Sequence, residues 1–373
     1  LMLLPREPTD EPKCRLLEGA MFYYLDKIGW KSKIIRSSRQ KVKYGTCYVE
    51  VLWESEEGLA PRRQKDSPLP EMRRTRVKDQ PQVNYVDETD IALDPGIPDV
   101  VDMGWVIIRK RYSWDDIQAQ VKRGVYSAAQ VVKISKGTGK GADFQSGKHE
   151  RFQSAGIHMA GIDRNDYEVL KMWGKVPRWW VDDIDVNDEG ANEMVQGVIE
   201  VCNHSGGPTL RLQRNPFWHQ EIPVAIGRHI GVDDEAQGMG VCEIGESLQQ
   251  ELNDKRNQLL DHATDTIMPP MVEQRAADIK EIRWEPGFRI KSNLPADQAL
   301  KALYPGGNPG EVVMMEQRVK DDIKGGTGAT APVQGQQSGK ESTAFEVSQL
   351  SARGSGRIDL STIDFGESFL KRV

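Results

Sequence analysis

The chain is organised around the stretch Gly245-Glu-Ser-Leu-Gln-Gln-Glu-Leu-Asn-Asp-Lys-Arg-Asn-Gln-Leu-Leu-Asp-His-Ala-Thr-Asp-Thr-Ile267. Its apolar residues recur at spacings that place them on one narrow stripe of an α-helix. They are Ile244, Leu248, Leu252, Leu259, Ala263 and Ile267. Ser247 and Gln250 predict a capping box at the start, and Pro269-Pro270 predicts the end. The pattern fits either a thin seam between neighbouring helices or an ordinary surface helix of a globular domain.

A small β insert and further helices follow. Met271–Gln274, Ile279–Trp284 and Phe288–Ser292 alternate apolar and polar residues, as short strands do. A second helix is predicted up to Lys324, with Val312, Val313, Met315, Val319 and Ile323 as its apolar residues. Residues 325–342 are rich in Gly and Gln, which predicts a mobile loop. Ser342 or Thr343, followed by Glu346, then predicts a capped third helix.

Upstream, several shorter patterns alternate between helix and strand. Leu16–Ile35 predicts one helix, Tyr44–Trp53 a strand, and Glu54–Gln80 an exposed loop or β excursion. Ser113 predicts the N-cap of a helix that runs to about Arg123. Further strands are predicted at 83–86, 105–109, 167–173, 197–202 and 209–212. The region up to residue 244 is therefore mixed, with both helices and strands.

This order of elements resembles that of phage portal proteins, the head-to-tail connectors of tailed bacteriophages, in particular the short-tailed, podovirus-like type. The similarity rests on short sequence motifs. Each motif is weakly specific alone, but together they follow the order found in portal proteins. They are Tyr44-Gly-Thr46, Ser113-Trp-Asp-Asp116, Asn215-Pro-Phe-Trp-His219, Leu248-Gln-Gln-Glu-Leu-Asn253 with Arg256-Asn257 and Asp261, Pro286-Gly287, and Glu341-Ser-Thr-Ala-Phe-Glu-Val-Ser-Gln-Leu350.

The resemblance implies an α+β portal fold, a DNA channel and a set of partners. The implied parts are a mixed wing (1–244), a first stem helix (245–267), a β-containing clip (268–308), a second stem helix (309–324), a tunnel loop (325–342) and a long wing helix leading towards a crown (343–373). It implies a homododecameric ring at one capsid vertex of the virion, assembled in the host cytoplasm. Double-stranded DNA would be packaged and ejected through the ring. The implied protein partners are the terminase large subunit, a tail adaptor or head-completion protein, and the major capsid and scaffolding proteins.

Three sets of candidate site residues follow. Stem packing is expected of Leu248, Leu252, Leu259, Val312 and Val319. Contacts of the clip with neighbouring subunits or docking partners are expected of Arg275, Lys280, Arg283, Trp284, Phe288 and Arg289. Transient contacts with sliding DNA are expected of the tunnel-loop residues Lys324, Gly325, Gly326, Thr327, Gly328, Gln334, Gln336, Gln337 and Lys340. A plain disordered linker is the alternative for this loop.

Composition limits the remaining possibilities. The 373 residues have a net charge of -6 and only 38% hydrophobic residues, which disfavours static nucleic-acid binding and a single compact core. The 4 cysteines form no C-x-x-C pair and are expected to be free thiols. No run approaches the roughly 18 apolar residues of a membrane helix, and no signal peptide is evident. The chain begins without Met and stops inside an expected helix, so we expect a fragment.

No pattern of catalytic residues stands out. Gly137-Thr-Gly-Lys-Gly141 departs from the phosphate-loop pattern, and the 6 histidines lack metal-ligand spacing. The acids Asp183, Asp185, Asp188 and Glu189 lack the frame of a calcium loop. We therefore expect no catalytic residue, metal or cofactor, and a structural protein rather than an enzyme. The alternatives are a DNA-processing enzyme and a monomeric interaction module of a phage particle.

Overall fold

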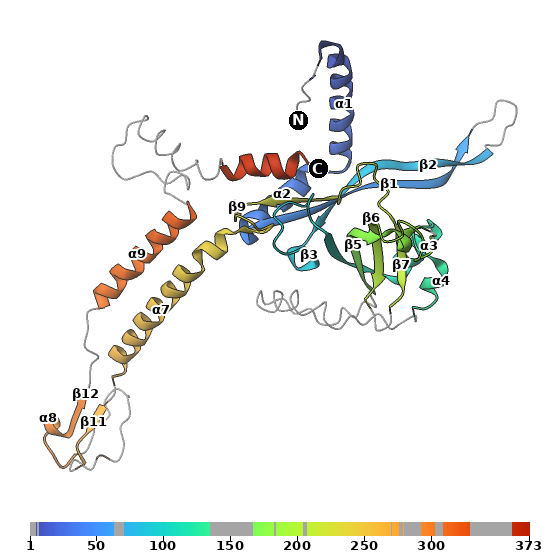
Figure 1. Ribbon diagram of the computed structural model, residues 1–373. Coiled ribbons are helices and arrows are strands. Elements are labelled where there is room, and N and C mark those ends of the chain that lie inside the picture. The colour runs from blue at the N-terminus through green and yellow to red at the C-terminus, as the bar shows by residue number, and fades with distance from the viewer. Residues whose placement is uncertain are drawn as a thin grey trace. The chain divides into compact units, whose positions relative to one another are not determined.

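The structure is a computed structural model that describes residues 5, 7–62, 71–134, 167–182, 184–203, 207–269, 271–275, 279, 292–302, 309–328 and 360–373. The chain divides into two compact units. The first unit combines Leu1–Val241 with Asp359–Val373, and the second, here called the helical unit, is Cys242–Ile358. Figure 1 labels the elements of both units.

Helices open the first unit. A short 3-10 turn, η1 (Pro8–Asp10), leads into α1 (Glu11–Lys27), and α2 (Trp30–Tyr44) follows. The prediction of one helix over Leu16–Ile35 was wrong, because the chain breaks at Gly29. Gly29 adopts a φ of 65°, a left-handed conformation that ends a helix and that glycine accepts without strain.

A three-stranded antiparallel sheet follows, in the order β2-β1-β8. Strands β1 (Thr46–Arg62) and β2 (Glu71–Val86) pair from Tyr48↔Val86 to Arg62↔Glu71, so the excursion over residues 54–80 is a long hairpin rather than a loop. Strand β8 (Val224–Arg228) pairs only with Thr46–Glu50 of β1. The outer hairpin therefore continues as a two-stranded ribbon, and in Figure 1 it extends away from the other strands.

A five-stranded antiparallel meander forms the second sheet, in the order β3-β4-β5-β6-β7. Its strands are β3 (Ile91–Leu93), β4 (Trp105–Tyr112), β5 (Tyr167–Pro177), β6 (Met194–Cys202) and β7 (Thr209–Arg214). The predicted cap at Ser113 is confirmed. Its Oγ accepts from the Asp116 N–H at 3.2 Å, and the Asp116 carboxylate accepts from the Ser113 N–H at 3.0 Å. This capping box starts α3 (Trp114–Lys122).

Short elements complete the first unit. They are η2 (Glu88–Asp90), α4 (Ala128–Val131), α6 (Arg178–Val181), β9 (Ile230–Gly231) and β10 (Gly238–Met239). Strands β9 and β10 pair with each other. Close approach of the backbone requires glycine at Gly45, because a Cβ there would lie 1.9 Å from the Gly238 carbonyl oxygen.

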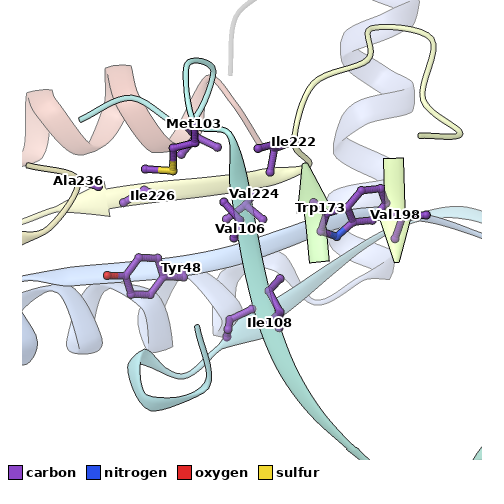
Figure 2. Close-up of a cluster of buried hydrophobic side chains, with 12 residues drawn as sticks. Tyr48, Met103, Val106, Ile108, Trp173, Val198, Ile222, Val224, Ile226 and Ala236 are labelled. Atoms are coloured by element: carbon purple, nitrogen blue, oxygen red, sulfur yellow. The ribbon is translucent and has the colours of Figure 1, made fainter. Parts of the chain in front are cut away.

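The main core lies between the two sheets. Figure 2 shows Tyr48 of β1 and Val224 and Ile226 of β8 together with Val106 and Ile108 of β4. Trp173 of β5 belongs to the same cluster and is buried. Burial of such side chains contributes roughly 1.5–3 kcal/mol each, which holds the sheets together as one unit.

A buried ionic network also joins the sheets. The Glu50 carboxylate of β1 accepts from Lys171 Nζ at 2.8 Å and Trp173 Nε1 at 3.0 Å, and it also pairs with Lys110. Burial opposes ionisation of Glu50, but the two ammonium groups outweigh it and hold its pKa below the ordinary value. The buried charges of Glu50 and Lys171 therefore depend on their partners, and not on water, for solvation.

The C-terminal residues 360–373 pack onto the three-stranded sheet. Residues 360–364 are helical and continue into the π-helix η4 (Phe365–Leu370). The rings of Phe365 and Phe369 stack at 4.5 Å, and Trp30 stacks on Phe369 at 6.4 Å. Lys41 Nζ donates to the Ser361 carbonyl oxygen at 3.1 Å and to its Oγ at 3.0 Å. The chain thus returns to the first unit after the helical unit.

The helical unit contains two long helices and a small β insert. Helix α7 (Val241–Ile267) leads to β11 (Met271–Glu273), α8 (Ala296–Ala299), β12 (Leu300–Ala302) and α9 (Pro309–Thr327). The predicted capping box at Ser247 was wrong, because α7 starts six residues earlier and Ser247 lies inside it. The strand predicted at Met271 is confirmed and pairs with β12, whereas those predicted at 279–284 and 288–292 fall largely outside the described residues.

Candidate functional site

The helices α7 and α9 form an antiparallel pair within the helical unit (Figure 1). Two contacts fix the direction. Arg256 Nη1 lies 3.6 Å from Glu316 Oε2, and a Cβ added at Gly326 would lie 3.9 Å from Ile244 Cγ2. Residue numbers therefore rise along one helix as they fall along the other. The β insert follows the end of α7 and precedes α9, so it lies at one end of the pair.

Helix α7 is only thinly covered. None of its 27 residues is fully buried. The predicted stripe is present over the first part of the helix, because Leu248, Leu252 and Leu259 are half-buried. Its last two members are exposed, Ile267 to 78% and Ala263 as well, like Leu260 at 53% outside the stripe. A helix of this length with no buried residue gains little stability from its own chain.

The inner stripe of α9 includes a charge. Val312, Glu316, Val319 and Ile323 recur at spacings of four and three, and Val319 and Glu316 are buried. The Glu316 carboxylate accepts from Lys320 Nζ at 2.6 Å and faces Arg256 of α7. The hydrogen bond from Lys320, with the charge of Arg256, lowers the pKa of Glu316 and keeps it ionised.

Glu316 is the site residue that the sequence interpretation missed. Its signal is the spacing, since a heptad-like count from Val312 to Val319 passes through Glu316. Val313 and Met315, which were included in the apolar set, are instead 49% and 46% exposed. Of the five residues expected in stem packing, all lie on the partly covered stripes of α7 and α9.

The end of α9 corrects the expected start of the loop. The helix continues through Thr327, so Gly325, Gly326 and Thr327 are helical, and only Gly328 lies beyond it. Thr327 Oγ1 donates to the Ile323 carbonyl oxygen at 2.7 Å, and Gly328 has a φ of 72°, as expected of a glycine that ends a helix. Lys324 pairs with Asp321 at 3.1 Å on the surface of the last turn. Gln334, Gln336, Gln337 and Lys340 lie outside the described residues.

The insert is described only in part. Arg275 follows β11 and is exposed. The other residues expected to dock partners, Lys280, Arg283, Trp284, Phe288 and Arg289, lie outside the described residues. Strands β11 and β12 pair over three positions, from Met271↔Ala302 to Glu273↔Leu300. A ribbon this short cannot form a core of its own.

The described part of the chain contains no group of three or more His, Cys, Asp and Glu side chains that could hold a metal ion. Within the same residues, no helix is both long and apolar enough to span a membrane. The conspicuous feature of the site is therefore its pair of sparsely covered helices and not a reactive group.

Comparison with known proteins decides the family. A model of the phage P22-like portal protein family matches residues 1–352. The chain belongs to this family. No curated protein sequence matches the chain. The portal subunit is thus a structural component of a phage head, through which DNA is packaged, and the podovirus-like resemblance is confirmed as P22-like. The α+β architecture described above agrees with the portal fold.

Family membership also gives the general setting of the portal subunit. Portal proteins are structural and non-enzymatic, and they form rings at a capsid vertex with capsid and terminase partners. In such a ring, identical subunits repeat around an axis, and each uses two different surfaces for its neighbours. The helical unit offers surfaces of this kind, because most side chains of α7 and α9 are exposed.

Proposed function

We propose that twelve copies of this chain form a ring whose α7 and α9 helices surround a passage for double-stranded DNA. The exposure of α7 supports this best, since a 27-residue helix without a buried residue requires neighbours to cover it. In a ring, the same helices of the adjacent subunit supply that cover. The Arg256–Glu316 contact then holds α7 and α9 of one subunit in a fixed register.

The residues after α9 are proposed to contact the passing DNA. Residues 329–342 carry only Lys340 as a cation and are rich in Gly and Gln, so they would touch phosphates without pinning them. Lys324 suits the same role, because its surface ion pair with Asp321 is weak enough to exchange with a phosphate. The acids of α7 outnumber its cations, which further favours passage over binding.

The β insert is proposed to contact neighbouring inserts and docking proteins. Among the described residues β11 and β12 pair only with each other, and pairing with the next insert would cover their outer edges. The partners proposed for this surface are the terminase large subunit and then a tail adaptor, with major capsid and scaffolding proteins around the rest of the ring. Arg275, Lys280, Arg283 and Arg289 supply cations for these contacts.

The purified chain tests the proposal directly. We expect sedimentation velocity to give about twelve times the 41.9 kDa mass of one chain, and negative-stain images to show rings with a central hole. We also expect no ATP hydrolysis and no DNA cleavage with Mg²⁺. A stable monomer at all concentrations would contradict the ring, and Mg²⁺-dependent turnover would favour a DNA-processing enzyme instead.

A further inference from the structure

The β1–β2 hairpin extends beyond the sheet from which it starts. Strand β8 covers β1 only as far as Glu50, yet β1 and β2 stay paired to Arg62 and Glu71. Among the side chains that the structure describes, the outermost anchor to the rest of the first unit is the ion pair of Glu56 with Arg123, at 3.0 Å. The part beyond this anchor, Glu57–Arg62 with Glu71–Lys78, is here called the arm. A two-stranded ribbon of this kind is at most marginally stable in water without a surface to pack on.

The arm is basic and partly apolar. It holds five cations against two acids: Arg62, Arg73, Arg74, Arg76 and Lys78 against Glu57 and Glu71. Leu59 and Val77 on the arm are each 62% exposed, and Trp53 at its base is 54% exposed. Large apolar side chains within a basic ribbon point to a partner surface that is acidic and apolar.

The first unit contains such a surface. The connection between α6 and β6 exposes Asp185, Asp188 and Glu189, and no cation pairs with these three carboxylates in the described part of the chain. The nearby cations are already engaged, since Arg178 pairs with Asp182 and Glu193, and Arg214 pairs with Asp182. Exposed apolar side chains flank the acids. They are Trp180, Val186 and Met194, at 44%, 50% and 56% exposure. This surface is here called the acidic patch.

The arm and the acidic patch lie at opposite ends of the five-stranded sheet. Helix α3, which carries the chain towards Arg123, packs on Tyr167 at the start of β5. The acidic patch follows Pro177 at the other end of β5, where Pro177 pairs with Met194. One subunit therefore cannot join its own arm to its own patch, but two successive copies in a ring can. A head-to-tail contact requires two complementary surfaces on different sides of each subunit.

We propose that the arm of one subunit docks on the acidic patch of the next copy of this chain. The proposal rests on the ring proposed above. A register shift between Glu56 and Glu57 places Arg76 with Leu59 on one face of the arm and Lys78 with Val77 on the other. Each face of the arm thus offers the acidic patch a cation for Asp188 or Glu189 and an apolar side chain for Val186 or Met194. Within one subunit, Arg76 pairs with Asp79 at 3.1 Å and Lys78 pairs with Glu54 at 3.3 Å. These are surface ion pairs, which exchange readily for other partners.

A charge swap tests the contact. The variants R76E/K78E and D188K/E189K are each expected to raise the chain concentration needed for half-assembly by about tenfold or more. The combined variant, with all four changes, is expected to restore assembly. The matched control is K31E/K133E, which reverses two exposed cations elsewhere and should assemble as the unchanged chain does. Equal assembly of the unchanged chain, R76E/K78E and D188K/E189K would overturn the proposal.

Cross-linking keeps the test independent of how the reversed charges affect folding. In assembled rings of V77C/V186C, a bismaleimide with a spacer of about 10 Å should join successive subunits into a ladder of multimers that single variants lack. Rings of this variant without a ladder would overturn the arm contact while leaving the ring itself intact. Absence of rings in the unchanged chain would instead contradict the proposed function.

Discussion

Glu50 lies fully buried between the two sheets of the first unit, where one carboxylate compensates the ammonium groups of Lys110 and Lys171. Such a network adds less to stability than its short distances suggest, because desolvation of the charges offsets much of the attraction. Removal of the Glu50 charge alone is expected to be costly. Buried Lys171 and partly exposed Lys110 would then lose the carboxylate that both contact, while the desolvation of their ammonium groups would remain.

Glu50→Gln is therefore expected to lower the free energy of unfolding of the first unit by about 3–5 kcal/mol. The dependence of this free energy of unfolding on pH should change as well. Since the folded-state pKa of Glu50 is depressed, its contribution is complete above the unfolded-state pKa of about 4.3 and is lost as the pH falls below it. Denaturant titrations at pH 7 and pH 3.5 should thus show a smaller difference for the variant than for the unchanged chain.

The control for this prediction is Glu57→Gln on the same strand. Glu57 is exposed, so its substitution should change neither stability nor the acid dependence by more than about 0.5 kcal/mol. If Glu50→Gln unfolds at the same denaturant concentration as Glu57→Gln, the network does not hold the sheets together.

At the scale of elements, the sequence predicted correctly those helices and strands whose formation depends mainly on interactions between residues close in the chain. The strand patterns from Trp105 onward and the cap at Ser113 are of this kind, since each depends on neighbouring residues. The helix start predicted at Ser247 was wrong because the residues before it can also be helical, so that the capping box is not needed. The contacts that extend α7 back to Val241 are not visible in the spacing of apolar residues. Strand β8 was missed because its pairing with β1 is a long-range contact of a short run. Glu316 was missed because it is a charged residue within the apolar stripe from which the packing face of α9 was predicted.

The docking of the C-terminal element depends on the absence of a side chain on β8. A Cβ at Gly227 would lie 2.7 Å from the Phe365 ring and 3.0 Å from Cys47 Sγ. Gly227→Ala should therefore displace η4 and lower the free energy of unfolding by about 1–3 kcal/mol. Faster amide exchange over residues 360–373 would locate the effect in this element.

Phe365→Ala supplies the second half of a double-mutant cycle. Because the smaller residue leaves room for the added methyl group, the two substitutions together should cost less than their sum by at least about 0.5 kcal/mol. Gly366→Ala is the matched control, since a Cβ there meets nothing within 4 Å. Strict additivity would mean that the ring of Phe365 does not determine the need for glycine.

At the scale of the whole molecule, the chain leaves the first unit after Val241 and re-enters it at Asp359. Both junctions flank the helical unit, so residues 329–358 connect the end of α9 to a segment that is held by Lys41 and Trp30. A change in these connecting residues can therefore test the proposed DNA contact without altering the sequence of α7, α9 or the first unit.

Deletion of 329–339 is expected to leave ring assembly unchanged and to reduce DNA packaging or retention several-fold in an assembly assay. The deletion begins at residue 329 because Gly325–Thr327 are helical and Gly328 ends α9, so a cut at Gly326 would also shorten the helix. Replacement of the same residues by an equally long Gly/Ser segment separates length from chemistry. If the Gly/Ser segment restores DNA packaging or retention, the length of the connecting residues is sufficient. If packaging or retention stays reduced, the native side chains make the contact. Loss of rings on deletion would show instead that these residues are structural, and the DNA-contact proposal would fall.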